Sequence, residues 1–129
     1  MHRVLVIDDD PAMTDLLNIV LSSNGMDVRV VNDGRSGLDC LDDYDPNIII
    51  LDLLMPDLDG WDVCKRIKEN HNTPILILSA VDSPGKIAEA LDAGADDYII
   101  KPVTSSTLIA HCNNLLRRSK KEKKLSPTE

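Results

Sequence analysis

Five short apolar runs at regular spacing constrain the fold of this chain more than any other feature of its sequence. The runs are rich in β-branched residues, and most lack the alternation of apolar and polar residues that marks a half-exposed strand. Such runs are typical of parallel strands that are covered on both faces of a sheet. We therefore predict strands at Val4–Ile7, Val28–Val31, Ile48–Leu51, Ile75–Leu78 and Tyr98–Ile100.

The segments between these runs have helical patterns. Asp10-Pro11 combines an N-cap residue with proline at the first helical position, and Gly25 marks the end of this first helix. Ser83-Pro84 and Gly94 bound the fourth helix in the same way. The apolar face of the first helix is predicted to hold Met13, Leu16, Leu17, Val20 and Leu21. Two shorter helices are predicted around Ser36–Leu41 and Trp61–Lys68, and a last helix carries Leu108, Ile109, Cys112, Leu115 and Leu116 and ends in Arg117 and Arg118.

Alternating strands and helices predict an α/β fold of five βα units. The expected architecture is a flavodoxin-like doubly wound sandwich, with a five-stranded parallel sheet of order 2-1-3-4-5 and helices on both faces. In such a sheet the switch point lies between the first and third strands, and ligands bind beyond the carboxyl ends of the strands.

Length and charge predict one domain followed by a short tail. The 129 residues and the hydrophobic content of 43% suit one compact domain, which we place at residues 1–118. Residues 119–129 read as a basic tail or the start of a linker. Residues 1–116 hold 8 basic and 20 acidic side chains, whereas residues 117–129 hold 6 basic and 2 acidic ones. A body this acidic is not expected to bind nucleic acid directly.

Several classes of protein are disfavoured by what the sequence lacks. No stretch approaches the roughly 20 apolar residues of a membrane span, and aspartates interrupt the N-terminal run, so we expect a cytoplasmic protein without membrane contact. The cysteines are odd in number and far apart, and the histidines are scattered, so neither a disulfide framework nor a cysteine or histidine metal site is expected. These residues are Cys40, Cys64, Cys112, His2, His71 and His111.

Acidic residues follow the first and third predicted strands. Asp8 and Asp9 come directly after the first strand, Asp52 follows the third, and Lys101 follows the fifth. If the strands are parallel, these side chains converge at one edge of the sheet. Clustered carboxylates repel one another and either hold a proton or recruit a cation, and oxygen ligands of this kind favour Mg²⁺.

The same edge could perform phosphoryl chemistry. Asp52 lies between a strand and a turn-forming loop, so it could attack phosphorus and form an acyl phosphate. Lys101 could then contact the phosphoryl oxygens, and the hydroxyl of Ser79, after the fourth strand, could donate to another. The remaining nearby aspartates read as cap and turn residues: Asp10, Asp57, Asp59 and Asp62.

Four segments resemble the receiver domain of response regulators in bacterial two-component systems, the CheY-like family. They are VLVIDDDP, IIILDLLMPDLDGWDV, ILILSA and GADDYIIKP, and the resemblance covers about residues 3–118. It implies that Asp52 accepts a phosphoryl group from a sensor histidine kinase or phosphotransfer protein, and that Asp9 binds Mg²⁺ directly and Asp8 through water. It further implies a metal-binding backbone carbonyl at Leu54, a switch hydroxyl at Ser79, a switch aromatic at Tyr98, a phosphate-contacting Lys101 and a cis Lys101-Pro102 bond.

The chain departs from many receivers at three positions. Val103 replaces the phenylalanine that often follows the Lys-Pro pair, and the chain contains no phenylalanine. Leu54 and Val81, two residues after Asp52 and Ser79, are apolar where some receivers have polar side chains that orient attacking water. We therefore predict slow autodephosphorylation, because these side chains would shield the acyl phosphate.

The predicted function is a signalling switch that catalyses only its own phosphorylation and dephosphorylation. GADDYIIKP is similar to receivers of longer regulators such as winged-helix transcription factors, which dimerise through the fourth helix, fifth strand and last helix. Alternatives are a stand-alone phosphorelay shuttle, a receiver used only for interaction, and a Mg²⁺-dependent aspartyl-phosphate phosphatase. Phosphatases of that class have a second aspartate two residues after the first, where this chain has Leu54. A flavodoxin-like nucleotide-binding protein would need a phosphate loop where this chain has Asp8 to Pro11.

Overall fold

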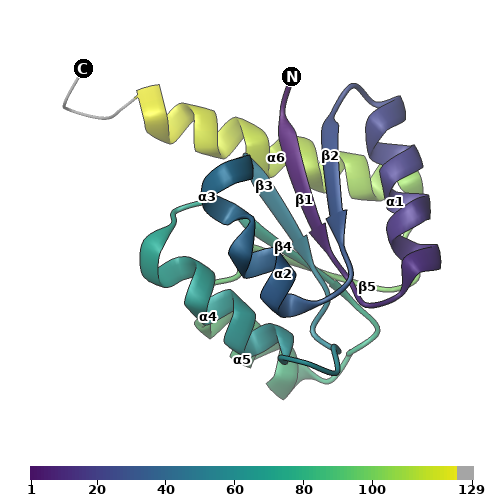
Figure 1. Cartoon of the computed structure of the whole chain (residues 1–129), viewed down its shortest axis with the longest axis vertical. Coiled ribbons are helices and arrows are strands. Elements are labelled where there is room, and N and C mark those ends of the chain that lie inside the picture. Colours follow the sequence, from purple (N-terminus) through teal and green to yellow (C-terminus); the bar gives the residue numbers. More distant parts are fainter. Residues whose placement is uncertain (125–129) are drawn as a thin grey trace.

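The computed structural model describes residues 1–124, with side chains described for residues 1–118. Its centre is a sheet of five parallel strands in the order β2-β1-β3-β4-β5, as the sequence predicts (Figure 1). The strands are β1 (Arg3–Ile7), β2 (Asp27–Val31), β3 (Ile48–Leu51), β4 (Ile75–Ser79) and β5 (Asp97–Ile100). The helices are α1 (Pro11–Ser23), α2 (Gly34–Asp39), α3 (Leu41–Tyr44), α4 (Gly60–Asn70), α5 (Pro84–Asp92) and α6 (Ser105–Lys124).

The core lies in two layers, one on each face of the sheet. Successive residues of a strand point to opposite faces, so Val4 and Val6 of β1 pack with α1 and α6, whereas Leu5 and Ile7 pack with the layer formed by α2, α3, α4 and α5. All four residues of β3 are buried. This two-sided burial explains why the strand sequences are continuous apolar runs.

The predicted helix boundaries are confirmed where the sequence carries capping signals. The side chain of Asp10 accepts a hydrogen bond from the amide of Ala12 at the start of α1, and Ser83 caps α5 through the amide of Lys86. Gly25 and Gly94, just past the ends of these helices, have φ angles of 81° and 118°, a region that glycine adopts without strain.

Three details of the helices differ from the prediction. The short helix α3 was not predicted, because a single turn with Leu41 and Tyr44 buried is too short to show a periodic pattern. Leu16 was placed on the apolar face of α1, but its side chain is 54% exposed, because α1 contacts the sheet through a narrower stripe that includes Leu17 and Leu21. Helix α6 continues past Arg118, because the lysines that follow favour a helix.

The predicted tail at residues 119–129 therefore begins inside a helix. Residues 119–124 continue the backbone of α6, and residues 125–129 lie outside the described residues. Within residues 1–124, none of the helices combines the length and the apolar character needed to span a bilayer.

The register of the sheet aligns the carboxyl ends of its strands. Ile7 of β1 pairs with Leu51 of β3, and the amide of Asp52 donates to the carbonyl of Ile7 at 3.0 Å. On the other side, Ser79 of β4 pairs with Ile100 of β5. The residues that directly follow β1, β3 and β5 are thus brought to the same edge of the sheet.

Candidate functional site

Three carboxylates meet at this edge. Asp8, Asp9 and Asp52 each offer one oxygen, and these oxygens lie within 4.8 Å of one another. The side chains of Asp8 and Asp52 are buried, with 3% and 7% of each residue exposed, whereas Asp9 is exposed. The structure thus brings together the three aspartates that the sequence places after β1 and β3.

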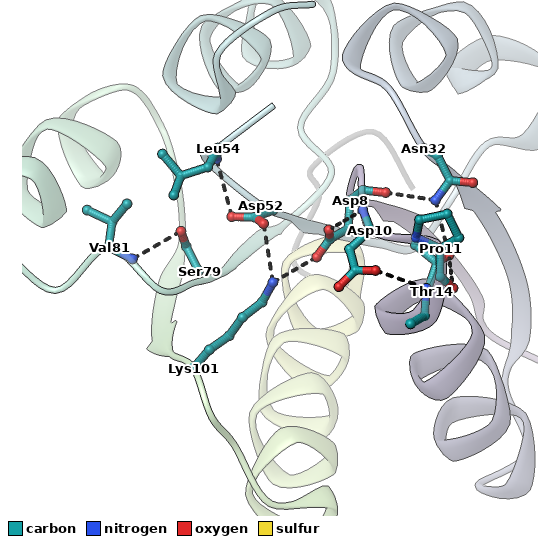
Figure 2. Close-up of polar contacts among 11 residues, drawn as sticks. Asp8, Asp10, Pro11, Thr14, Asn32, Asp52, Leu54, Ser79, Val81 and Lys101 are labelled. Carbon is teal, nitrogen blue, oxygen red and sulfur yellow. Dashed lines mark hydrogen bonds and ion pairs between the residues drawn. The ribbon is translucent and has the colours of Figure 1, made fainter. Parts of the chain in front are cut away.

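Lys101 bridges the two buried carboxylates (Figure 2). Its Nζ donates to Asp8 Oδ2 at 2.9 Å and to Asp52 Oδ2 at 3.2 Å. Burial by itself lowers the pKa of Lys101, but the hydrogen bond to Asp8 and the charge of Asp52 outweigh it, so the pKa is raised and the ammonium stays charged. The neighbouring Lys101-Pro102 bond is cis, as the resemblance implies.

Burial also acts on Asp8, in the opposite direction from the charge of Lys101. Removal from water raises the pKa of the Asp8 carboxyl, against the hydrogen bonds from the Asp10 amide and from Lys101, which lower it. Burial therefore disfavours the carboxylate form of Asp8 at this edge. A carboxyl whose pKa is perturbed by burial beside a specific charged partner is a candidate functional residue.

The donor set fits a hard divalent cation. Two unit negative charges 4.8 Å apart repel by about 3.5 kcal/mol at an effective dielectric of about 20, and one ammonium faces three carboxylates. Carboxylate oxygens without sulfur or imidazole ligands are the coordination that Mg²⁺ prefers. The amide of Leu54 donates to Asp52 Oδ1 at 3.3 Å, which places the loop after β3 beside the cluster.

Ser79 and Tyr98 are linked through the loop that follows β4. Ser79 is fully buried at the end of β4, and its Oγ accepts a hydrogen bond from the amide of Val81 at 3.3 Å. The hydroxyl of Tyr98, in β5, donates to the carbonyl of Val81. Burial raises the pKa of the Tyr98 phenol. One short backbone segment thus contacts both residues that the sequence predicts to be switch residues.

Asp57 makes a contact that its sequence position did not reveal. It reads as a turn residue, but its two carboxylate oxygens accept hydrogen bonds from the amides of Gly34 and Arg35, each at 3.1 Å. These bonds tie the loop after β3 to the start of α2. The hydrogen bond from Gly34 lowers the pKa of Asp57, and the hydrogen bond from Arg35 lowers it further.

Asp59 was also predicted to be a cap or turn residue. This prediction is confirmed, since the side chain of Asp59 accepts a hydrogen bond from the amide of Asp62 at the start of α4.

Two further residues near the acidic loop also escaped the sequence prediction. Asn32 follows β2, and its side-chain amide donates to the carbonyl of Asp8 at 2.9 Å and to Oγ1 of Thr14 at 3.1 Å (Figure 2). An asparagine after a strand is an ordinary turn residue, and a threonine in a helix carries no signal of its own. Only the folded chain places them beside Asp8.

Comparison with known proteins identifies relatives across most of the chain. The family model described as the response regulator receiver domain matches residues 4–113. The DNA-binding response regulator MtrA of Mycolicibacterium smegmatis is 37% identical over 94% of this chain and 53% of its own length. The response regulator MprA of Mycobacterium avium is 43% identical over 93% of this chain and 53% of its own length.

A solved structure agrees with these sequence matches. The receiver domain of the Francisella response regulator 1452 has a TM-score of 0.87 and 38% sequence identity, and the match covers 92% of this chain and 99% of that one. The chain spans about half the length of the curated relatives it matches, whereas it matches the isolated receiver domain almost end to end.

Proposed function

Because this chain belongs to the response regulator receiver family, we propose that it is a phosphorylation switch in which Asp52 accepts a phosphoryl group from a sensor histidine kinase or a phosphotransfer protein. The observation that carries this proposal is the pairing of Lys101 with both Asp8 and Asp52, beside the exposed Asp9. A buried nucleophile, a fixed cation and a set of metal-binding oxygens at one strand edge suit phosphoryl transfer.

The proposed transfer needs one bond made and one broken. A carboxylate oxygen of Asp52 attacks phosphorus, the P–N bond of the phosphohistidine breaks, and its electron pair returns to the imidazole nitrogen, leaving an acyl phosphate on Asp52. Lys101, already within hydrogen-bonding distance of Asp52, would then bind a phosphoryl oxygen. Bound Mg²⁺ would neutralise charge on the phosphoryl group, and the residues proposed to hold it are Asp8, Asp9, Asp52 and the backbone carbonyl of Leu54.

The proposed output uses the linkage between Ser79 and Tyr98. A phosphoryl group on Asp52 offers new acceptor oxygens, and the Ser79 hydroxyl would donate to one of them. Because the Val81 amide donates to Ser79 and the Val81 carbonyl accepts from Tyr98, movement of Ser79 would change the position of Tyr98 on β5. The proposed result is a change in the face formed by α5, β5 and α6, which would favour a homodimer.

We propose further that the chain is the receiver part of a longer regulator, such as a transcription factor. The support is that it spans about half of relatives such as MtrA, whose name describes a DNA-binding regulator. A stand-alone phosphorelay shuttle is the alternative. A phosphatase acting on outside substrates is less well supported. That class has a second aspartate at the position of Leu54, and Leu54 is an exposed apolar residue.

Intact-mass measurement after incubation with acetyl phosphate and Mg²⁺ tests the acceptor. The wild-type chain should gain the mass of one phosphoryl group and Asp52→Asn should gain none. Asp15→Asn, which changes an exposed aspartate on α1, is the matched control and should be labelled like the wild type. Equal labelling of Asp52→Asn and the wild type would overturn the assignment. Light scattering of the same samples measures the proposed dimer.

A further inference from the structure

The loop that carries Asp8 and Asp9, two of the proposed metal-binding residues, is held by hydrogen bonds to a neighbouring loop. Residues 8–11 connect β1 to α1, and Asn32 lies in the connection between β2 and α2. The Asn32 amide donates to the carbonyl of Asp8 and to Oγ1 of Thr14, and Thr14 Oγ1 donates to the carbonyl of Pro11 at 3.1 Å (Figure 2). This series of contacts joins both ends of the acidic loop to the chain after β2.

The orientation of the Asn32 amide follows from its partners. The carbonyl of Asp8 can only accept a hydrogen bond, and the Thr14 hydroxyl gives its proton to the carbonyl of Pro11, so Thr14 Oγ1 can only accept from Asn32. The amide nitrogen, with two hydrogens, satisfies both partners, whereas the amide oxygen would face two acceptors. The contact therefore depends on the donors of Asn32 and on the hydroxyl of Thr14.

The fastened segment is the one whose backbone sets the direction of two carboxylates. The backbone amide of Asp8 also bonds to this end of β2, because it donates to the carbonyl of Val31 at 3.2 Å, and Asp8 Oδ1 accepts from the Asp10 amide at 3.0 Å. Asp9, between Asp8 and Asp10, is exposed. Asp8 and Asp9 repel each other and Asp52, and without the Asn32 contact the loop has fewer bonds to resist that repulsion.

We propose that Asn32 and Thr14 are positioning residues that hold the backbone of Asp8 and Asp9 and thereby set the affinity of the carboxylate cluster for a divalent cation. This inference rests on the proposed function. Neither residue contacts the cation or the phosphoryl group; both act through Asp8. Loss of one such hydrogen bond should weaken cation binding by roughly three- to tenfold, which is the range expected for a single neutral hydrogen bond.

Four variants test the inference, and all of them keep the net charge of the chain. Asn32→Ala removes the donor at an exposed position, and Thr14→Val removes the hydroxyl of a residue that is 1% exposed while keeping its shape. Thr14→Ser keeps the hydroxyl. Asn72→Ala, in the exposed connection between α4 and β4, is the matched control. Urea unfolding of each variant first establishes that it is folded under the binding conditions.

The direct measurement is binding of Mn²⁺, used as a spectroscopic substitute for Mg²⁺, followed by electron paramagnetic resonance of the free ion. Asn32→Ala and Thr14→Val should bind the ion roughly three- to tenfold more weakly than the wild type, whereas Thr14→Ser and Asn72→Ala should match it. In phosphorylation by acetyl phosphate, Asn32→Ala should need more Mg²⁺ for half-maximal rate but reach the wild-type rate at saturation.

The outcomes separate this inference from the proposed function. Wild-type affinity in both Asn32→Ala and Thr14→Val would overturn the positioning role while leaving the metal site intact. Equal weakening in Thr14→Ser, which keeps the hydroxyl, and in Thr14→Val, which lacks it, would show that the effect does not follow the hydroxyl and would also overturn the proposed contact. Absence of Mn²⁺ binding by the wild-type chain would overturn the proposed metal site and this inference with it.

Discussion

Substitution of Gly60 by alanine should disturb the loop after β3 directly, at the backbone of Asp52, the proposed phosphoacceptor. Gly60 is the first residue of α4, and its amide donates to the carbonyl of Leu53 at 2.8 Å, which closes the loop after β3. A Cβ atom on Gly60 would lie 2.4 Å from the Cα of Leu53 and 2.5 Å from the backbone carbonyl oxygen of Asp52. Both are backbone atoms, so neither can rotate away.

The expected magnitude follows from these distances. Ordinary van der Waals contact to a Cβ begins near 3.4 Å, so the backbone at Leu53 and Asp52 must move by about 1 Å. Inserting a carbon into a well-packed region lowers the free energy of unfolding by about 1–3 kcal/mol. The higher helix propensity of alanine raises it by less than about 1 kcal/mol. We expect Gly60→Ala to lower the free energy of unfolding by about 2 kcal/mol.

Gly85 offers a matched control at a similar place in another helix. It is the second residue of α5, and apart from its chain neighbours and the backbone of its own helix no heavy atom lies within 4 Å of a Cβ built on it. Gly85→Ala should therefore leave the free energy of unfolding unchanged or raise it by up to about 1 kcal/mol.

Urea unfolding followed by circular dichroism measures both glycine variants, and the rate of labelling by acetyl phosphate reports on Asp52. Gly60→Ala should be both less stable and more slowly labelled, because the displaced backbone carries the proposed acceptor, Asp52. The reasoning is refuted if Gly60→Ala unfolds within about 0.5 kcal/mol of the wild type and is labelled at the same rate.

Three other predictions concern charge and solvent access at the site. Because burial raises the pKa of Asp8, its ionised form opposes folding at neutral pH. Without Mg²⁺, Asp8→Asn should therefore unfold at a higher urea concentration than the wild type, and it should gain less stability than the wild type from added Mg²⁺. A lower stability of Asp8→Asn than of the wild type without Mg²⁺ would contradict this. Hydrogen bonds from Gly34 and neighbouring amides hold the pKa of Asp57 below 3.8, so its ionised form stabilises the fold above that pH. The loss of unfolding free energy caused by Asp57→Asn should be largest at about pH 6 and should shrink towards pH 3. A difference between Asp57→Asn and the wild type that does not change with pH would argue against this. The amide of Leu54 donates to Asp52 and that of Val81 donates to Ser79, so both apolar residues lie beside the proposed acceptor. Loss of phosphate from the isolated phosphoprotein should be slow, and the double variant Leu54→Asn with Val81→Gln should accelerate it by up to roughly a hundredfold. Rapid loss of phosphate from the wild type that both substitutions leave unchanged would contradict this prediction.

Much of the fold could be predicted because its signals are local. Continuous β-branched runs such as Ile48–Leu51 indicate buried parallel strands, and the caps at Asp10 and Ser83 fix where α1 and α5 begin. The placement of Asp8 and Asp52 at one edge followed from parallel strands in the common order. Helix α3 and the continuation of α6 could not be predicted with the same signals, because a single turn has no period and a solvated helix end has no apolar face.

The sequence by itself determined which residue types stand at the strand ends, since that depends only on the alternation of strand and helix along the chain. The tertiary structure alone decided which of them touch: Lys101 reaches both Asp8 and Asp52, Asp57 binds the start of α2, and Asn32 binds the carbonyl of Asp8. Each of these contacts joins loops from different strands. Their distances depend on the register of β1 against β2, β3 and, through the sheet, β5, and that register is set by packing on both faces of the sheet rather than by any one segment.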